Sequence, residues 1–175
     1  MAKNKFPFML FMFAFTILAG CAPYTPDTPL YEGKNLDIGM IGDAPEIREN
    51  NITFTEMTLD ELKEGADFPS AVDAVFIQKD YLSDAADSKY AKVYQKAGIP
   101  FFFIESKKSY VPFVIEDLSY EEVPDLSPDM YASGYYQSGD KAQFWGYGLY
   151  NDQVNPANIK DVYSQIFTTI ASLPQ

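Results

Sequence analysis

A chain of 175 residues, with 47% apolar and 16% aromatic residues, is long enough and apolar enough for one folded domain, and its composition is not that of a disordered polar stalk. It has no histidine and a single cysteine, Cys21, which excludes histidine-containing catalytic triads, zinc sites of histidine and cysteine, and internal disulfides. The formal net charge of −12 opposes binding to nucleic acid and to anionic lipid headgroups.

The N-terminal segment has the layout of a secretory signal. Two lysines, at positions 3 and 5, precede an apolar run from Phe6 to Leu18, and the small residues Ala19 and Gly20 come directly before Cys21. A charged start, an apolar stretch and small residues at the cleavage point are typical of a signal peptide. The apolar run is shorter than the roughly 20 residues that a membrane-spanning helix needs.

The sequence Leu18-Ala19-Gly20-Cys21 resembles the lipobox of bacterial lipoproteins. In that family the cysteine thiol receives a diacylglycerol, and cleavage before the cysteine leaves a lipidated N-terminus. The resemblance implies that residues 1–20 are a signal peptide and that Cys21 carries a covalent diacylglycerol and an acyl chain. Because two or more chains anchor a protein stably, it also implies a lipid-anchored protein on the extracytoplasmic face of the cell membrane.

The chain after the signal divides into a linker and one predicted domain. Residues 21–33 contain three prolines among polar residues and predict an extended, Pro-rich linker. Residues 34–175 predict a single α/β domain, in which apolar or alternating runs indicate strands and capped amphipathic runs indicate helices. The expected strands are Leu36–Gly42, Ile52–Met57, Val72–Ile77 and Ile99–Ile104, and the expected helices are Thr58–Lys63 and Ser83–Lys96.

Alternation of strands and helices predicts a small three-layer domain with a mainly parallel, flavodoxin-like or Rossmann-like sheet. The segment Val111–Ile115 is expected to be an edge strand, where its proline is tolerated. Tyr131–Gln137 and Lys141–Tyr150 flank the turn Ser138-Gly139-Asp140 and predict an aromatic hairpin. Pro156 then begins a terminal helix. Its apolar stripe, expected to pack on the sheet, consists of Ile159, Val162, Tyr163, Ile166, Phe167 and Ile170.

Polar residues at the strand ends form the first candidate binding site. Ligands of open α/β sheets bind at the carboxyl ends of the strands where the strand order switches, and in a flavodoxin-like order the first and third strands flank that point. Asp43 follows the first strand, and Lys79, Asp80 and Tyr81 follow the third. The two aspartates are candidates to hold a cation, and Lys79 to contact a carboxylate ligand. The alternative is that these are ordinary polar residues at the starts of loops.

A nucleotide site is not predicted at the first strand. Gly39 and Gly42 lack the third glycine of the dinucleotide-binding motif, and Asp43 stands where backbone amides should face an anion.

The aromatic hairpin is the second candidate site. Alternation along its second strand places Trp145 and Tyr147 on one face, and Phe144 with two glycines on the other. Exposed rings beside bare glycines can form a flat surface that stacks on a sugar or a protein partner. The alternative is that one face covers the core while the other shields the edge of the sheet.

These patterns predict a binding or accessory role at the cell envelope rather than catalysis. The expected partners are the membrane, through the lipid anchor, and a small molecule, a glycan or an envelope protein, with no nucleic acid. No cofactor is predicted besides the lipid on Cys21, and no metal is assigned. Two other classes stay open: a cation-dependent enzyme that uses carboxylates at the strand ends, and a structural or assembly partner of an envelope complex.

Overall fold

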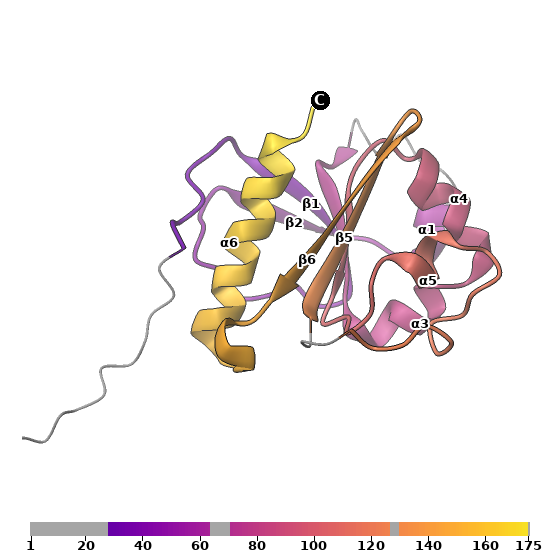
Figure 1. Cartoon of the computed structure of the whole chain (residues 1–175). Helices are drawn as coiled ribbons and strands as arrows, with labels where there is room; N and C mark the ends of the chain where they lie inside the picture. The colour runs from indigo at the N-terminus through magenta and orange to yellow at the C-terminus, as the bar shows by residue number, and fades with distance from the viewer. Residues whose placement is uncertain (1–27, 64–70, 127–129, 175) are drawn as a thin grey trace, which may run out of the picture.

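A six-stranded mixed sheet forms the centre of the fold (Figure 1). The computed structural model describes residues 28–63, 71–126 and 130–174, so the signal segment and Cys21 lie outside the described residues. The strand order is β2-β1-β3-β4-β5-β6. The strands are β1 (Leu36–Ile41), β2 (Ile52–Glu56), β3 (Ala74–Ile77), β4 (Phe101–Ile104), β5 (Met130–Ser138) and β6 (Lys141–Gly148).

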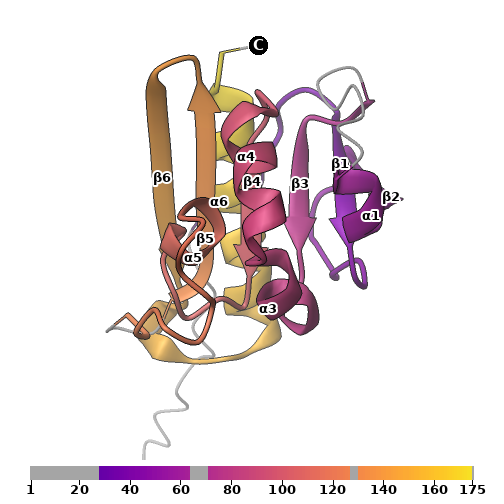
Figure 2. The same cartoon turned by 90° about the vertical axis from the view of Figure 1, so that its right-hand side faces the viewer.

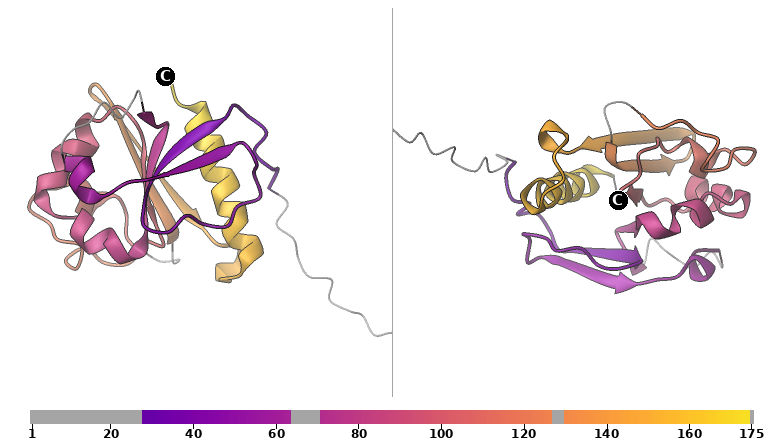
Figure 3. Two further views of the ribbon diagram at one scale, coloured as in Figure 1. Left: turned by 180° about the vertical axis from the view of Figure 1, so that it is seen from behind. Right: turned by 90° about the horizontal axis from the view of Figure 1, so that it is seen from below.

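The four strands β2, β1, β3 and β4 are parallel, and the β5–β6 hairpin continues the sheet antiparallel to β4. In the views of Figure 3, the hairpin and the β1–β2 pair lie at opposite edges of the sheet. This confirms the predicted α/β class, the mainly parallel sheet and the C-terminal hairpin, and of the two predicted strand orders the parallel strands adopt the flavodoxin-like one.

Helices cover both faces of the sheet, which gives the predicted three layers. Among the described residues, the short helices α1, α3, α4 and α5 lie on one face, and the long helix α6 lies on the other (Figures 1 and 2). None of the helices in the described ranges is both long enough and apolar enough to cross a bilayer. The helices are α1 (Leu59–Lys63), α3 (Leu82–Ala85), α4 (Ser88–Lys96), α5 (Val111–Val114) and α6 (Pro156–Ser172), and 3₁₀ turns occupy Lys79–Tyr81 and Tyr150–Asp152.

The central strands are apolar without alternation because both of their faces are buried. All four side chains of β3 are fully buried, as are those of β4. Val75 and Ile77 of β3 pack in the cluster under α4, whereas Phe76 packs in the cluster under α6. Successive residues of a strand point to opposite faces, so each face needs its own covering helix.

Phe76 lies at the centre of the core on the α6 side. Its ring centroid is 5.4 Å from that of Phe102 on the neighbouring strand. It is also 6.1 Å from the rings of Tyr163 and Phe167 on α6. Aromatic contacts at these distances add to the gain from burying apolar area. The rings of α6 therefore join the last helix to the middle of the sheet.

A polar clamp also fixes α6. The Ser164 hydroxyl of α6 donates a short hydrogen bond to the buried carboxylate of Glu49. Arg48, the chain's one arginine, donates to the same hydroxyl from Nη2 at 2.6 Å, and its guanidinium lies 3.8 Å from the Asp161 carboxylate. Arg48 and Glu49 belong to the β1–β2 connection. This connection has no helix of its own, so α6 covers the face of the sheet that a helix here would otherwise cover.

The start of the described chain packs against α6. Tyr31, which falls in the predicted linker, is only 7% exposed, and its ring centroid lies 6.2 Å from that of Phe167. The carbonyl of Thr28 accepts a hydrogen bond from Arg48 at 3.4 Å. The end of the linker range therefore contributes a core residue.

Two predicted elements differ in the structure. Val111–Val114 is the short helix α5 rather than an edge strand. Its Pro112 lies in the first turn, where proline is tolerated, and Phe113 stacks on Phe103 with centroids 3.5 Å apart. A short apolar run does not distinguish strand from helix by its pattern, so packing decided this element.

The predicted helix Ser83–Lys96 is broken into α3 and α4. Asp87 caps the second piece by accepting a hydrogen bond from the Lys89 amide at 3.0 Å. Ser83 is not a cap, since its hydroxyl donates to Glu121 at 2.7 Å. The predicted cap Thr58 is confirmed, because its hydroxyl accepts from the Glu61 amide and the Glu61 carboxylate accepts in return.

Truncation of Phe76 tests whether the packing of α6 on the sheet depends on this ring. We expect Phe76→Ala to lower the free energy of unfolding by about 3–5 kcal/mol, because it removes a fully buried ring and leaves a cavity. Phe144→Ala removes a ring of the same size that is 61% exposed, and should cost about 1 kcal/mol or less. Urea denaturation of both variants measures the difference. Equal losses would contradict the central role of Phe76.

Candidate functional site

The carboxyl ends of β1, β3 and β4 border an open cavity of about 490 Å³. It lies at the switch point of the strand order, because the chain leaves β1 toward β2 on one side and returns to β3 on the other. The cavity is lined by Gly42, Asp43, Ala44, Pro45, Glu46, Gln78, Lys79, Asp80, Tyr81, Glu105, Tyr131, Ile159 and Tyr163.

Backbone contacts hold the ends of β1 and β3 together at the cavity. The Gln78 amide donates to the Ile41 carbonyl at 3.0 Å, and the Gln78 side chain donates to the Asp43 carbonyl at 3.1 Å. Gly42 has a φ of +104°, and a Cβ there would lie 2.8 Å from Cβ of Gln78. The turn that brings Asp43 to the cavity therefore requires glycine.

One ion pair crosses the cavity between two strand ends. Nζ of Lys79 lies 3.1 Å from the Glu105 carboxylate, and this hydrogen bond is the main reason why the pKa of Lys79 is raised. Glu105 itself has a φ of +54°, an uncommon conformation for a residue other than glycine. The charge of Lys79 is thus already matched by a carboxylate of the protein.

The other carboxylates of the cavity differ in their partners. Glu46 pairs with Lys160 of α6 at 3.1 Å. The side chain of Asp43 has no hydrogen bond or ion pair to the residues that the structure describes, whereas Asp80 interacts with Lys79 through charge. Both aspartates are exposed, so water solvates them and the cavity has an excess of negative charge.

Two tyrosines form the inner wall of the cavity. Tyr163 comes from α6 and Tyr131 from β5, and their rings meet edge to face with centroids 6.4 Å apart. Burial is the main cause that raises the pKa of both hydroxyls, and the Tyr163 hydroxyl also interacts with the side chain of Gln78. A register irregularity between Met130 and Ala132 turns Tyr131 toward this side of the sheet.

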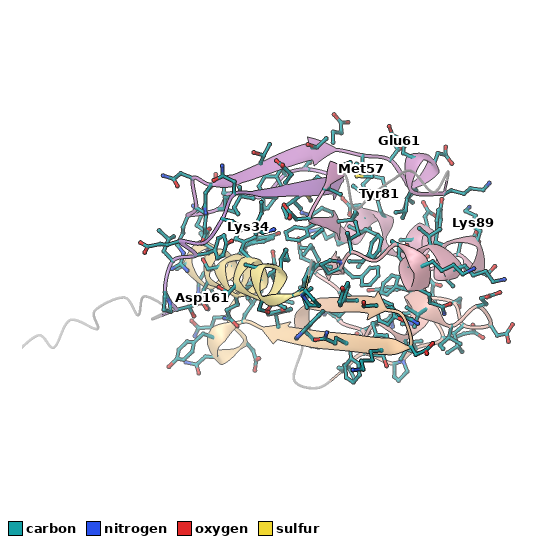
Figure 4. All side chains as sticks on the ribbon, turned by 90° about the horizontal axis from the view of Figure 1, so that it is seen from above. Lys34, Met57, Glu61, Tyr81, Lys89 and Asp161 are labelled. Carbon is teal, nitrogen blue, oxygen red and sulfur yellow. The ribbon has the colours of Figure 1, made fainter. Side chains whose placement is uncertain are left out.

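A second hollow of about 500 Å³ adjoins the first on the β2 side. The two share Gly42, Asp43, Ala44 and Tyr81. The further lining residues of the second hollow are Met40, Ile41, Phe54, Glu56, Met57, Thr58, Leu59 and Asp84. Met57 and Tyr81, both labelled in Figure 4, lie at this end of the sheet. We call the two hollows together the divided groove.

The structure brings four of the predicted site residues together and separates two from them. Asp43, Lys79, Asp80 and Tyr81 all line the cavity. Trp145 stacks on Phe102 with centroids 6.2 Å apart, on the α6 side of the sheet.

Tyr147 lies in the same α6-side cluster as Trp145. It is only 7% exposed, and its hydroxyl donates to the Thr169 hydroxyl at 2.8 Å. The more exposed ring of β6 is Phe144, on the opposite face, which stacks on Tyr110 at 4.9 Å.

The inner wall of the cavity is not predicted by the sequence. The sequence places Tyr131 in the aromatic hairpin and Tyr163 in the apolar stripe of the last helix. Neither assignment is wrong, but the sequence contains no local signal that both rings reach the ends of β1 and β3. Glu46 and Ile159 also line the cavity. They reach it because α6 packs against the β1–β2 connection, which the sequence does not predict.

In the ranges that the structure describes, no three carboxylates, histidines or cysteines are grouped as ligands for a metal ion. Comparison of the chain with known protein families, with characterised proteins and with solved structures finds no match.

Alkaline pH tests the placement of Tyr147 in the core. Burial raises the pKa of Tyr147 to about 12, against 10 for an exposed tyrosine. Its contribution to stability is complete below pH 10 and is lost as the pH rises toward 12, because the unfolded chain ionises first. Between pH 10 and 12, wild type should lose roughly 2 kcal/mol more of its unfolding free energy than Tyr147→Phe does. Urea denaturation at each pH measures this difference.

Tyr150→Phe is the matched control, since Tyr150 is 47% exposed and its substitution leaves Tyr147 in place. It separates the effect of removing the buried hydroxyl from that of removing an exposed one. If Tyr147→Phe had the same pH dependence as wild type, the burial of the Tyr147 hydroxyl would be contradicted.

Proposed function

We propose that this protein is an extracytoplasmic lipoprotein, held in the cell membrane by lipid on Cys21, whose α/β domain binds a small ligand. The binding site is the cavity at the carboxyl ends of β1, β3 and β4. The observation that carries this proposal is the convergence of Asp43, Lys79, Asp80 and Tyr81 from two separate strand ends on one open cavity. The switch point of an open α/β sheet is the usual position of a ligand in such folds.

The chemistry of the lining groups suits recognition. Carboxylates, an amide and phenol hydroxyls supply hydrogen bonds, and the Tyr81 ring, 41% exposed, supplies apolar contact area. Lys79 is held by Glu105, which fixes the position of both side chains. A pre-formed arrangement of this kind lowers the conformational entropy that the protein side chains would lose on binding a ligand.

The anchor is tested by substitution of the cysteine. Wild type, expressed as the full chain in a bacterial host, should incorporate labelled palmitate and sediment with membranes. Cys21→Ser removes the thiol that would receive the diacylglycerol, so it should incorporate no label and should leave the membrane fraction. A full-length Cys21→Ser product that stays in the membrane to the same extent as wild type would contradict the lipid anchor.

The binding site is tested by thermal stabilisation. A ligand that binds only the folded chain stabilises it by RT ln(1 + [L]/Kd), so the melting temperature rises with the ligand concentration. In a screen of amines, carboxylates, sugars and small peptides, at least one class should stabilise wild type but not Asp43→Asn/Asp80→Asn. The control, Asp140→Asn, changes a carboxylate in the β5–β6 turn, at the other end of the sheet. Equal stabilisation of all three proteins would contradict a site at the strand ends.

A further inference from the structure

We infer that two copies of this chain associate through β6, as antiparallel neighbours that join their two sheets edge to edge. The pairing uses the opposite edge of the sheet from β2 and none of the cavity at the strand ends, so it goes beyond the proposed function and does not rest on it. Three properties of β6 carry the inference: its open backbone edge, its lack of the usual protection of such edges, and the opposite charges at its two ends.

The strand β6 forms an open edge of the sheet. It is last in the strand order, and in the described ranges it pairs only with β5. Six of its eight residues are exposed, and Figure 2 shows it at the left-hand edge of the sheet. The backbone amide and carbonyl groups on the outer side of an edge strand have no partner in their own sheet, and another extended strand can pair with them. The occupant that these groups fit is therefore a β-strand.

The strand β6 also lacks the features that usually prevent an edge from pairing with another chain. Those features are short length, a proline, a bulge or a charged residue within the strand. From Ala142 to Gly148, β6 has no proline and no charged residue. The register irregularity of the hairpin falls on β5, between Met130 and Ala132. By contrast, the other edge strand, β2, has five residues and ends in Glu56. Of the two edges, β6 is the one left open to pairing.

The hairpin allows two copies to approach despite the charge of the chain. The formal net charge of −12 opposes self-association in general. From Met130 to Gly148, however, there is one acidic residue, Asp140, and one basic residue, Lys141, so the hairpin has no net charge. Phe144 in the middle of β6 is 61% exposed, and its ring stacks on Tyr110 at 4.9 Å. Pairing would remove part of this ring from water, which adds to the gain from cross-strand contacts.

The charges at the ends of β6 favour a second copy in the antiparallel direction. Lys141 begins the strand, and Asp152 lies in the 3₁₀ turn after its other end, while Asp140 lies one position farther out than Lys141. Lys141 and Asp152 are both exposed, and neither side chain has an ion pair or hydrogen bond to the rest of the described chain. In an antiparallel pair of copies, the Lys141 end of each strand lies beside the Asp152 end of the other. Two identical attractions form at once, whereas a parallel pair would bring like charges together.

A two-fold axis also fixes which residues lie at the centre of the contact. Residues directly opposite each other in an antiparallel pair point to the same face of the sheet, so the residue beside the axis pairs with itself. Overlap of the two strands is greatest when this residue is Phe144 or Trp145. An interface of eight residues per copy is small beside the roughly 20–30 residues per side of a standard interface, so we expect a Kd in the micromolar range.

Sedimentation of the purified full chain in a mild detergent, over a range of concentrations, measures the association. Wild type should pass from monomer to dimer in the micromolar range. Phe144→Lys puts a charge in the centre of the edge and should weaken the dimer about tenfold or more. Ile115→Lys makes the same change at another exposed apolar residue, after α5, and should leave the dimer unchanged. Circular dichroism should show the three proteins equally folded. A wild type that stays monomeric throughout would refute the inference.

Removal of the end charges tests the orientation. Lys141→Gln and Asp152→Asn should each weaken the dimer about fivefold, because a symmetric dimer loses two exposed ion pairs. Asparagine tolerates the φ of +54° at position 152. The double variant should be no weaker than either single variant, since one partner of each pair is already absent. Additive losses would show that the two charges do not meet, and would refute the antiparallel arrangement.

Cysteine cross-linking with a short bis-maleimide locates the contact. Gln143→Cys, exposed and next to the expected axis, should cross-link to the same residue of a second copy, whereas Thr55→Cys, exposed on the β2 edge, should not. Wild type, whose one cysteine is Cys21, gives the background. Equal cross-linking of the two variants would refute a contact through β6. If Gln143→Cys in intact cells gave only a product of a different size from the dimer, a strand of another protein would occupy the edge, and the second copy would be refuted.

Discussion

The burial of β3 on both faces is the constraint on which the rest of the structure depends. Its four side chains alternate between two clusters, and none is accessible to solvent. One cluster is covered by α3 and α4, which follow β3 directly in the chain. The other has no local cover, because the β1–β2 connection is too short and irregular to supply a helix. The last helix, α6, covers it, held by aromatic contacts to Phe76 and by the contacts of Arg48 and Glu49 with Ser164.

The candidate site is a consequence of the same arrangement. Because α6 lies beside the β1–β2 connection, Tyr163 and Ile159 reach the switch point and close the cavity from behind. The Glu46–Lys160 pair joins the same two segments at its rim. An acidic domain that has no arginine besides Arg48 is poorly suited to phosphate ligands.

Elements with a strong local pattern could be predicted, and elements decided by packing could not. The parallel strands, the hairpin and α6 are long or sharply bounded by turn residues, so their periodicity was sufficient. The segment Val111–Val114 failed because four apolar residues with a proline fit either an edge strand or a first helical turn. The helix predicted from Ser83 is interrupted before Asp87. The Asp87 side chain caps the start of α4, and a residue of this type is favoured at the start of a helix rather than in its middle.

By itself, the sequence determined the fold class, the mainly parallel sheet and the positions of four polar residues at two strand ends, while the strand order stayed open between a flavodoxin-like and a Rossmann-like sheet. The lipid anchor on Cys21 stays a prediction from the sequence. Only the tertiary structure decided that Tyr147 lies in the core with Trp145 packed against it, while Tyr131 and Tyr163 line the cavity. Backbone periodicity is a local property, so it is present in the sequence. Which face of a strand or helix meets another element depends on contacts between residues far apart in the chain, and these form only when the two layers close on β3.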